Sequence, residues 1–294
     1  MRTLGYFCRY VPQELLEACG FKAIFFKPDF SSPQFSSLPV PFCALCKTFI
    51  SWALNHRELS GFVVPLTCDA SRRTYEILRA LSVPVFPLDV PALPGEIASR
   101  WLTENLNELA RELLAQSGRS FSEFTASLRQ TLEETLRQRE AFFREWEERR
   151  GASNRIPLLL SGSHFAYALL PLLEEKGFLV FPDLPENRFL LGEEPLLLTA
   201  SPLEDLTRLL LHRLPCPWFS GSARRIALKK LCDTLGLRGV VIVFSKFCDF
   251  QLYEIGLLRR SFGLPVLCLE HDTTSSFPQW ETRLDAFREM ILRG

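Results

Sequence analysis

Residues 240–254 read VVIVFSKFCDFQLYE, and this stretch decides the fold class. An apolar run leads into a cysteine and an aspartate, and a segment with the pattern of a helix follows. A second stretch, GFVVPLTCDASRRTYE at residues 61–76, has the same order of features. Each stretch is followed by another apolar run that opens with a Pro-Val pair, at residues 84–85 and 265–266. The chain therefore contains an internal repeat of strand, cysteine-aspartate, helix and strand.

The segments that precede the two stretches also match each other. Residues 4–26 and 157–183 each read as a strand, a loop, a helix, a Gly-Phe pair and a second strand. Glycine just after a helix is typical of a left-handed helix cap, here at Gly20 and Gly177. Short apolar strands that alternate with helices predict parallel sheets built from βαβ units. We therefore expect an α/β protein with two Rossmann/flavodoxin-like parallel-sheet domains.

The region between the repeats has a different composition. It has few β-branched residues, many Glu, Arg and Leu residues, and apolar residues at helical spacing. We expect helices here, with a break near Gly118 and a capped restart near Ser122. The expected order is an N-terminal α/β domain at 1–95, a helical connector at 96–154 and a C-terminal α/β domain at 155–294.

Composition narrows the class of protein and its partners. The chain of 294 residues is 47% hydrophobic and 23% charged, which is enough apolar sequence to bury a core. Its formal net charge of zero makes nucleic acid an unfavourable partner. The first residues lack the apolar run of a signal peptide, and no apolar run is long enough to span a membrane. We expect a cytoplasmic protein whose nine cysteines are reduced.

Cys68 and Cys248 occupy equivalent places in the repeat, each at the expected end of a strand and just before a helix. Ligands of open parallel sheets bind in the crevice at the carboxyl ends of the strands. A helix N-terminus carries free N–H groups and a partial positive charge, which favours a thiolate. The pattern favours two thiolates that face each other across a cleft between the domains. The alternative is that both cysteines pack in the core, as free cysteines often do.

A further pattern, PVPFCALCKTFISWAL, places Cys43 and Cys46 ahead of another expected helix. A single CxxC pair occurs in zinc, redox and iron–sulfur sites. No second CxxC and no nearby histidine pair accompany it, which argues against a zinc ribbon, and no thioredoxin-like pattern surrounds it. Soft thiolates in an α/β cleft suit an iron–sulfur cluster.

Six stretches of the chain together resemble the 2-hydroxyacyl-CoA dehydratase component D family, which also includes benzoyl-CoA reductase subunits and double-cubane cluster proteins. They are GYFCRYVPQELLEACGF, FCALCKTF, LTCDASRRTYE, FSKFCDFQLYE, GLPVLCLEHD and PQWETRLDAFREMI. They lie in both halves, and the resemblance extends over nearly the whole chain. The KFCD segment and the terminal TRxxAFxEM pattern are the most specific of them.

The resemblance implies a [4Fe-4S] cluster in the interdomain cleft, held by three cysteines with one iron left open. Carried onto this chain, the matching ligands are Cys43, Cys68 and Cys248. The family pattern of a cysteine, three residues, a basic residue and Ser or Thr fits Cys43 rather than Cys46. Cys46 is then a core residue or an extra ligand. The family also implies an ATP-hydrolysing iron–sulfur activator, a homodimer or a heterodimer with a paralogous subunit, and an acyl-CoA substrate.

The expected activity is that of a lyase of the 2-hydroxyacyl-CoA dehydratase type or of an ATP-dependent reductase component. Two alternatives remain open: a double-cubane [8Fe-9S] reductase of small molecules, and a non-catalytic assembly or partner subunit of the same fold. Glu270, His271 and Asp272 end the last expected strand and are candidates for acid–base chemistry.

Overall fold

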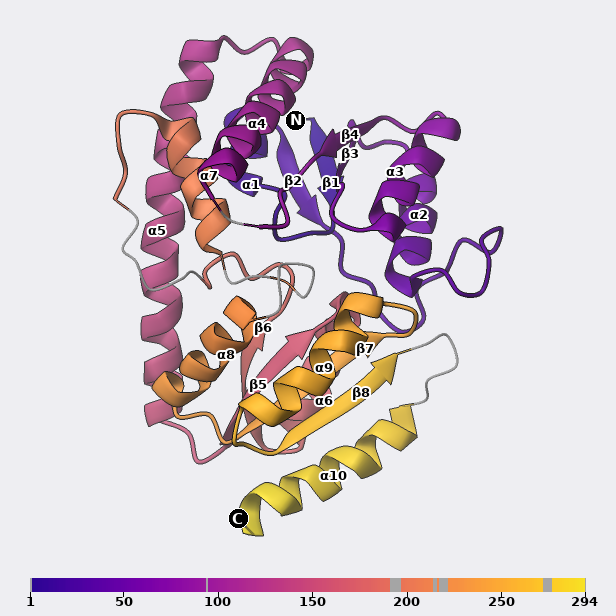
Figure 1. Cartoon of the computed structure of the whole chain (residues 1–294), viewed down its shortest axis with the longest axis vertical. Helices are drawn as coiled ribbons and strands as arrows, with labels where there is room; N and C mark the ends of the chain where they lie inside the picture. Colours follow the sequence, from indigo (N-terminus) through magenta and orange to yellow (C-terminus); the bar gives the residue numbers. More distant parts are fainter. Residues whose placement is uncertain are drawn as a thin grey trace. The chain divides into compact units, whose positions relative to one another are not determined.

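The computed structural model describes residues 2–93, 95–190, 197–213, 216, 222–271 and 277–293. It contains two four-stranded sheets whose strands are all parallel, with helices packed against them (Figure 1). The predicted α/β class with two parallel sheets is therefore confirmed. Among the residues described, no helix is both long and apolar enough to cross a lipid bilayer.

The repeat seen in the sequence is present in the structure. The first sheet has β1 (Thr3–Tyr6), β2 (Lys22–Phe25), β3 (Gly61–Pro65) and β4 (Val85–Leu88), with α1 (Gln13–Ala18), α2 (Ala44–Asn55) and α3 (Asp69–Ala80) between them. The second has β5 (Ile156–Gly162), β6 (Phe178–Asp183), β7 (Gly239–Ser245) and β8 (Val266–His271), with the 3₁₀ helix η1 (His164–Leu169), α6 (Leu170–Glu175), α8 (Ser222–Leu235), α9 (Asp249–Ser261) and the terminal α10 (Phe277–Arg293).

Both sheets have the same strand order. The first is β2-β1-β3-β4 and the second is β6-β5-β7-β8, so β3 and β7 are equivalent strands. In each sheet the chain reverses its direction of travel between the two central strands, which makes that point a topological switch point. Ligands of open α/β sheets bind outside the carboxyl ends of the strands at such points. The two predicted strand-end cysteines follow β3 and β7.

The chain's internal contacts divide it into two compact units. The first comprises residues 1–26, 49–142 and 188–214, and the second comprises 27–48, 143–187 and 215–294. The segment 27–48, which carries Cys43, thus belongs to the unit of the second sheet. The sequence-based ranges 1–95, 96–154 and 155–294 stay a prediction about folding domains.

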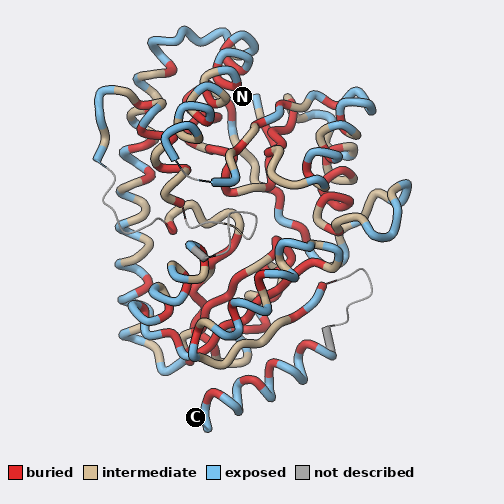
Figure 2. The backbone as a smooth tube through the Cα atoms, viewed as in Figure 1, coloured by how far each residue is buried: buried red, intermediate tan, exposed pale blue. Residues whose placement is uncertain are grey.

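In the second unit, alternate residues of the strands build a core on one face of the sheet. The strands contribute Leu158, Leu160, Val241, Val243 and Leu269, and α10 contributes Trp280, Leu284, Phe287 and Ile291. Helix α9 packs against β7, and α8 packs against α9. Figure 2 shows the result: β5, β6 and β7 are mostly buried and β8 is mostly of intermediate burial, whereas the helices alternate between buried and exposed residues. Burial on both faces explains the nearly continuous apolar run of β7.

The connector forms two long helices, α4 (Glu96–Ser117) and α5 (Phe121–Gly151), and α7 (Pro202–His212) packs against α4. Gly118 adopts a left-handed φ of 77° and ends α4, as predicted. The residue that caps α5 is Ser120, not Ser122 as we expected. The hydroxyl of Ser120 accepts the N–H of Glu123 at 3.2 Å, and the Glu123 carboxylate accepts the N–H of Ser120 at 2.8 Å. This reciprocal capping box fixes the helix start two residues earlier.

Gly162 at the end of β5 is required by a close approach of two backbones. Its φ is 121°, and a Cβ built there would lie 1.9 Å from the carbonyl oxygen of Val243. The same oxygen accepts the N–H of Ser163 at 2.7 Å, so the strands meet at the switch point itself.

We expect Gly162→Ala to lower the free energy of unfolding by about 3 kcal/mol or more, because both the φ and the collision oppose a side chain. The matched control is Gly256→Ala on α9, where a built Cβ meets no heavy atom within 4 Å. That change should stabilise the helix by about 0.5–1 kcal/mol. Urea unfolding measures both, and equal effects of the two substitutions would contradict the account.

Candidate functional site

The three predicted ligands share one local setting. Cys43, Cys68 and Cys248 each stand directly before the first residue of a helix, namely α2, α3 and α9. All three are partly exposed. At this position a side chain faces the unpaired N–H groups of the first helical turn, and the helix dipole adds positive potential. A place at the start of a helix is thus the feature that the three positions share.

Hydrogen-bond donors surround the sulfur of Cys43. The thiol of Cys46 donates a hydrogen bond to its sulfur, and the backbone N–H groups of Cys46 and Leu45 donate as well. Together with the nearby ammonium of Lys47, these donors outweigh the effect of burial and lower the pKa of Cys43 to about 7. A substantial fraction of Cys43 is therefore thiolate at neutral pH.

Cys68 is held by a reciprocal cap. Its sulfur faces the backbone N–H of Ser71, and the hydroxyl of Ser71 accepts the N–H of Cys68 at 3.3 Å. The buried Ser71 hydroxyl also donates to the carbonyl of Pro65 at 2.6 Å. The last residue of β3 and the first turn of α3 are thus joined through one side chain, which fixes the position of Cys68.

The turn that carries Cys248 has an unusual backbone. Phe247 adopts a left-handed φ of 64°, which is rare for a bulky residue. The turn is fixed by hydrogen bonds: the N–H of Lys246 donates to the carbonyl of His271 at 2.8 Å, and the N–H of Ser245 donates to the side chain of Gln251 at 2.9 Å. Such conformations are concentrated at functional sites. This one sets the direction of the chain immediately before the cysteine.

A pocket of about 460 Å³ lies within the second unit, beside two of these cysteines. Its lining is apolar except for two lysines and two small polar side chains, and consists of Gln34, Phe35, Ser36, Leu38, Val40, Phe42, Ala44, Lys47, Lys246 and Phe247. Ala44 and Phe247 are the sequence neighbours of Cys43 and Cys248. The pocket is therefore lined by the residues next to these two cysteines, and neither cysteine is itself part of the lining.

The two lysines make the pocket cationic. Lys47 is buried, and its ammonium donates to the carbonyl of Val40 at 3.2 Å. Within the part of the chain that the structure describes, Lys47 forms no ion pair with a carboxylate. The ammonium of Lys246 lies 5.6 Å from the centre of the Phe247 ring. A buried ammonium without a carboxylate partner is costly, so this pocket is suited to an anionic ligand.

A buried ion network anchors the helix that follows Cys248. Arg224 of α8 contacts the carboxylates of Asp183 at 2.6 Å and Glu254 at 2.7 Å, and it donates to the hydroxyl of Ser161 at 2.9 Å. Burial alone lowers the pKa of Arg224, but the two carboxylates outweigh it and raise the pKa. The network therefore joins α8, α9 and the ends of β5 and β6.

The other predicted site residues have different surroundings. Cys46 is 2% exposed, in the first turn of α2. Glu270 is exposed on β8. His271 is buried at the end of β8, where its ring packs edge-on against Phe165 with the centroids 3.7 Å apart. Asp272 lies outside the described residues.

The proposed metal ligands stay a prediction. Among the described residues, no group of three or more Cys, His, Asp or Glu side chains is placed to hold a metal ion. Cys43 and Cys248 belong to the second unit, whereas Cys68 belongs to the first. The donor chemistry of each position, a thiolate at a helix N-terminus, fits an iron–sulfur cluster. The three cysteines therefore remain predicted ligands.

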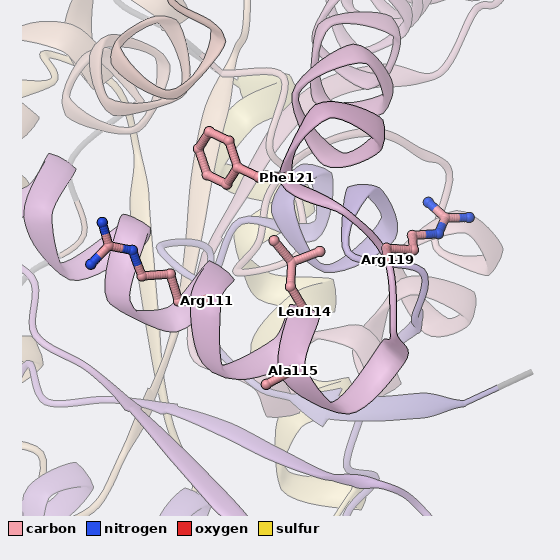
Figure 3. A pocket seen from close by; sticks show the side chains of 5 residues that line it. All are labelled: Arg111, Leu114, Ala115, Arg119 and Phe121. Atoms are coloured by element: carbon pink, nitrogen blue, oxygen red, sulfur yellow. The ribbon is translucent and has the colours of Figure 1, made fainter.

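Another depression, of about 480 Å³, lies on the hairpin of α4 and α5 (Figure 3). Arg111 and Arg119 lie on either side of Leu114, and Phe121 lines the same depression. Arg119 is used structurally, because it donates to the carbonyl of Ala18 at 3.0 Å. The lining contains no thiol, carboxylate or imidazole, so this depression offers no metal ligand or nucleophile.

The sequence did not identify the two lysines as parts of a pocket. Lys47 was visible only as the basic residue of a pattern after Cys43, and Lys246 precedes Cys248 by two residues. The signal in the sequence that could have indicated them was a basic residue close to Cys43 and another close to Cys248. The segment 34–42, which forms the other wall, has no periodic pattern that predicts its position.

The fold and these residues define an α/β protein with cysteines presented at helix N-termini. A comparison with protein families matches residues 8–151 and 122–291 to the 2-hydroxyglutaryl-CoA dehydratase, D-component. The chain belongs to this family. It is thus related to a dehydratase component, as the motifs indicated.

Comparisons with curated proteins and with solved structures add no information about the function of the chain. No curated protein matches the chain. Solved structures that it resembles include ZnuA (13% identity over 99% of this chain and 98% of that chain, TM-score 0.32). They also include the periplasmic zinc-binding protein TroA from Treponema pallidum (11% identity, 99% and 96%, TM-score 0.32). TM-scores this low carry no argument about fold or function.

Proposed function

We propose that the chain is an iron–sulfur component of a 2-hydroxyacyl-CoA dehydratase or a related reductase. In this proposal Cys43, Cys68 and Cys248 hold a [4Fe-4S] cluster. The observation that carries it is the equivalent placement of Cys68 and Cys248, each capping a helix at the switch point of one of two repeated sheets. Membership of the dehydratase D-component family supports the same function.

The residues of the chain would serve such a cluster in two ways. The N–H groups of the helix starts stabilise the thiolates before and after they bind metal. The Arg224 network and the Ser71 cap keep the cysteines in place. When bound, the cluster supplies low-potential one-electron chemistry and an open iron that acts as a Lewis acid. The electron would come from an ATP-hydrolysing activator. A second subunit of the same fold would be the partner, and the reaction would take place in the cytoplasm.

The pocket of the second unit is the proposed substrate site. Its apolar walls suit an acyl chain, and Lys47 and Lys246 suit the phosphates or the free carboxylate of 2-hydroxyglutaryl-CoA. We expect Lys246→Gln to weaken the binding of 2-hydroxyglutaryl-CoA about tenfold or more, the worth of one charge-assisted hydrogen bond. Anaerobic titration calorimetry measures the change. Lys229→Gln on α8, which removes an exposed lysine of the same unit, should leave the affinity unchanged. Equal affinities of wild type and Lys246→Gln would contradict this substrate site.

Electron paramagnetic resonance tests the function itself. The protein is purified without oxygen, reduced with a low-potential reductant and mixed with 2-hydroxyglutaryl-CoA. We expect the signal of a reduced iron–sulfur cluster, and we expect the thioester to change that signal. A reduced protein without any such signal would contradict the proposal.

A further inference from the structure

We propose that Cys43 and Cys46 form a reversible disulfide in the cluster-free chain, by exchange with a low-molecular-weight disulfide. The site involves one of the proposed cluster ligands, but the reaction itself needs no cluster. The inference therefore rests on the geometry of α2, and its test does not depend on the proposed function.

The two cysteines stand three residues apart at the start of one helix. Cys43 is the residue before α2, and Cys46 is the third residue of the helix. Side chains at these two places face each other, as in a capping box. The first turn is regular, because the N–H of Lys47 donates to the carbonyl of Cys43 at 3.1 Å. Residues three apart in a helical turn have Cα atoms about 5 Å apart, within the range that a disulfide spans.

The two thiols differ in access, as a nucleophile and a resolving thiol should. Cys43 is partly exposed, and its neighbour Ala44 lines the pocket of the second unit. Cys46 is 2% exposed, and its thiol already donates a hydrogen bond to the Cys43 sulfur. A small disulfide can therefore reach Cys43 but not Cys46. A reactive cysteine beside a buried partner is the arrangement of thiol–disulfide exchange sites.

The exchange has two steps. The Cys43 thiolate attacks one sulfur of the small disulfide, its sulfur–sulfur bond breaks, and one small thiolate leaves and takes up the proton that Cys43 lost. The Cys46 sulfur then attacks the Cys43 sulfur, and a second small thiolate leaves with the proton of Cys46. Two cysteine thiols are oxidised to one disulfide, and the small disulfide is reduced to two thiols.

The other proposed ligands lack this partner. The third helical residue is Ser71 after Cys68 and Gln251 after Cys248. Two further cysteines, Cys19 and Cys232, are buried and out of reach of a small disulfide. The Cys43–Cys46 disulfide should thus form in preference to others. A disulfide at Cys43 and metal binding at Cys43 exclude each other, so cluster loading would require its reduction.

Oxidised glutathione tests the proposal on cluster-free protein. The full chain is incubated with it, the remaining thiols are blocked with N-ethylmaleimide, and tryptic peptides are analysed by mass spectrometry. Cys43 and Cys46 lie in one peptide that ends at Lys47 and contains no other cysteine. We expect this peptide to lose both alkylation sites and to carry an internal disulfide that dithiothreitol reverses.

The matched variant is Cys46→Ser, which gives α2 the serine that α3 has at the same place. It should keep the fold, and the reaction should stop at a glutathione adduct on Cys43. A wild-type peptide that is alkylated at both cysteines, that keeps a glutathione adduct, or that joins Cys43 to a different cysteine would overturn the proposal.

Discussion

Replacing Cys248 with serine is expected to reduce the iron content of anaerobically purified protein from about four atoms per chain to less than about one. A hydroxyl is a hard, weakly acidic ligand and does not replace a thiolate on iron. Serine is also one of the most favourable residues before a helix, so α9 should begin as it does in the wild type. Loss of iron from a folded chain would therefore report a lost ligand.

The matched control is Cys232→Ser on α8. Cys232 is buried in the core of the second unit and follows no strand end. Its replacement should leave the iron content unchanged, although it lowers stability somewhat. Retention of full iron by Cys248→Ser, with the fold verified by circular dichroism, would remove Cys248 from the ligand set.

The second large effect concerns stability. Glu14 is fully buried in the first unit, where Arg213 contacts both of its carboxylate oxygens at 2.9 and 3.1 Å and Arg188 lies at 3.8 Å. Arg213 is itself 3% exposed. We expect Arg213→Met to lower the free energy of unfolding by about 3–5 kcal/mol, because it leaves a buried carboxylate without its main partner. Urea unfolding at neutral pH measures the change.

The pH dependence gives this prediction a specific signature. Burial raises the pKa of Glu14, but the charges of Arg213 and Arg188 outweigh it, and the pKa lies below its ordinary value of 4.5. In the wild type the contribution of Glu14 is therefore complete above pH of about 4.5 and is lost as the pH falls through the lowered pKa. Without Arg213, the effect of burial dominates and the pKa of Glu14 rises. As the pH falls, protonation of Glu14 removes its buried charge, and the variant regains part of its stability.

The deficit of Arg213→Met should thus be largest at neutral pH and should shrink on acidification. The double variant Glu14→Gln/Arg213→Met removes the buried charge and should recover much of the lost stability at neutral pH. A deficit that is the same at all pH values, or a double variant no more stable than Arg213→Met, would contradict this description of the pair.

Features with a local cause could be predicted from the sequence. The strand-end cysteines follow from short apolar runs that turn polar, and β3 and β7 end just ahead of them. Gly20 and Gly177 adopt the left-handed conformation that their places after helices demand, with φ of 91° and 85°. The same holds for Gly118. In each case the residues that decide the structure are within one turn of it.

Features that depend on contacts between residues far apart in the sequence could not be predicted. The segment 27–48 has no strong periodicity, and its place with the second sheet depends on contacts far along the chain. Lys47 and Lys246 are far apart in the sequence and line one pocket only because that segment folds as it does. The left-handed conformation of Phe247 is likewise unforeseen, because a bulky residue disfavours it and the surrounding hydrogen bonds impose it.

The most direct test of the central claim is the iron and acid-labile sulfide content of the wild-type chain purified without oxygen. The proposal predicts about four of each per chain. About eight irons would indicate the double-cubane alternative instead. A correctly folded protein that contains neither iron nor sulfide, even after anaerobic reconstitution, would contradict the claim that Cys43, Cys68 and Cys248 hold a cluster.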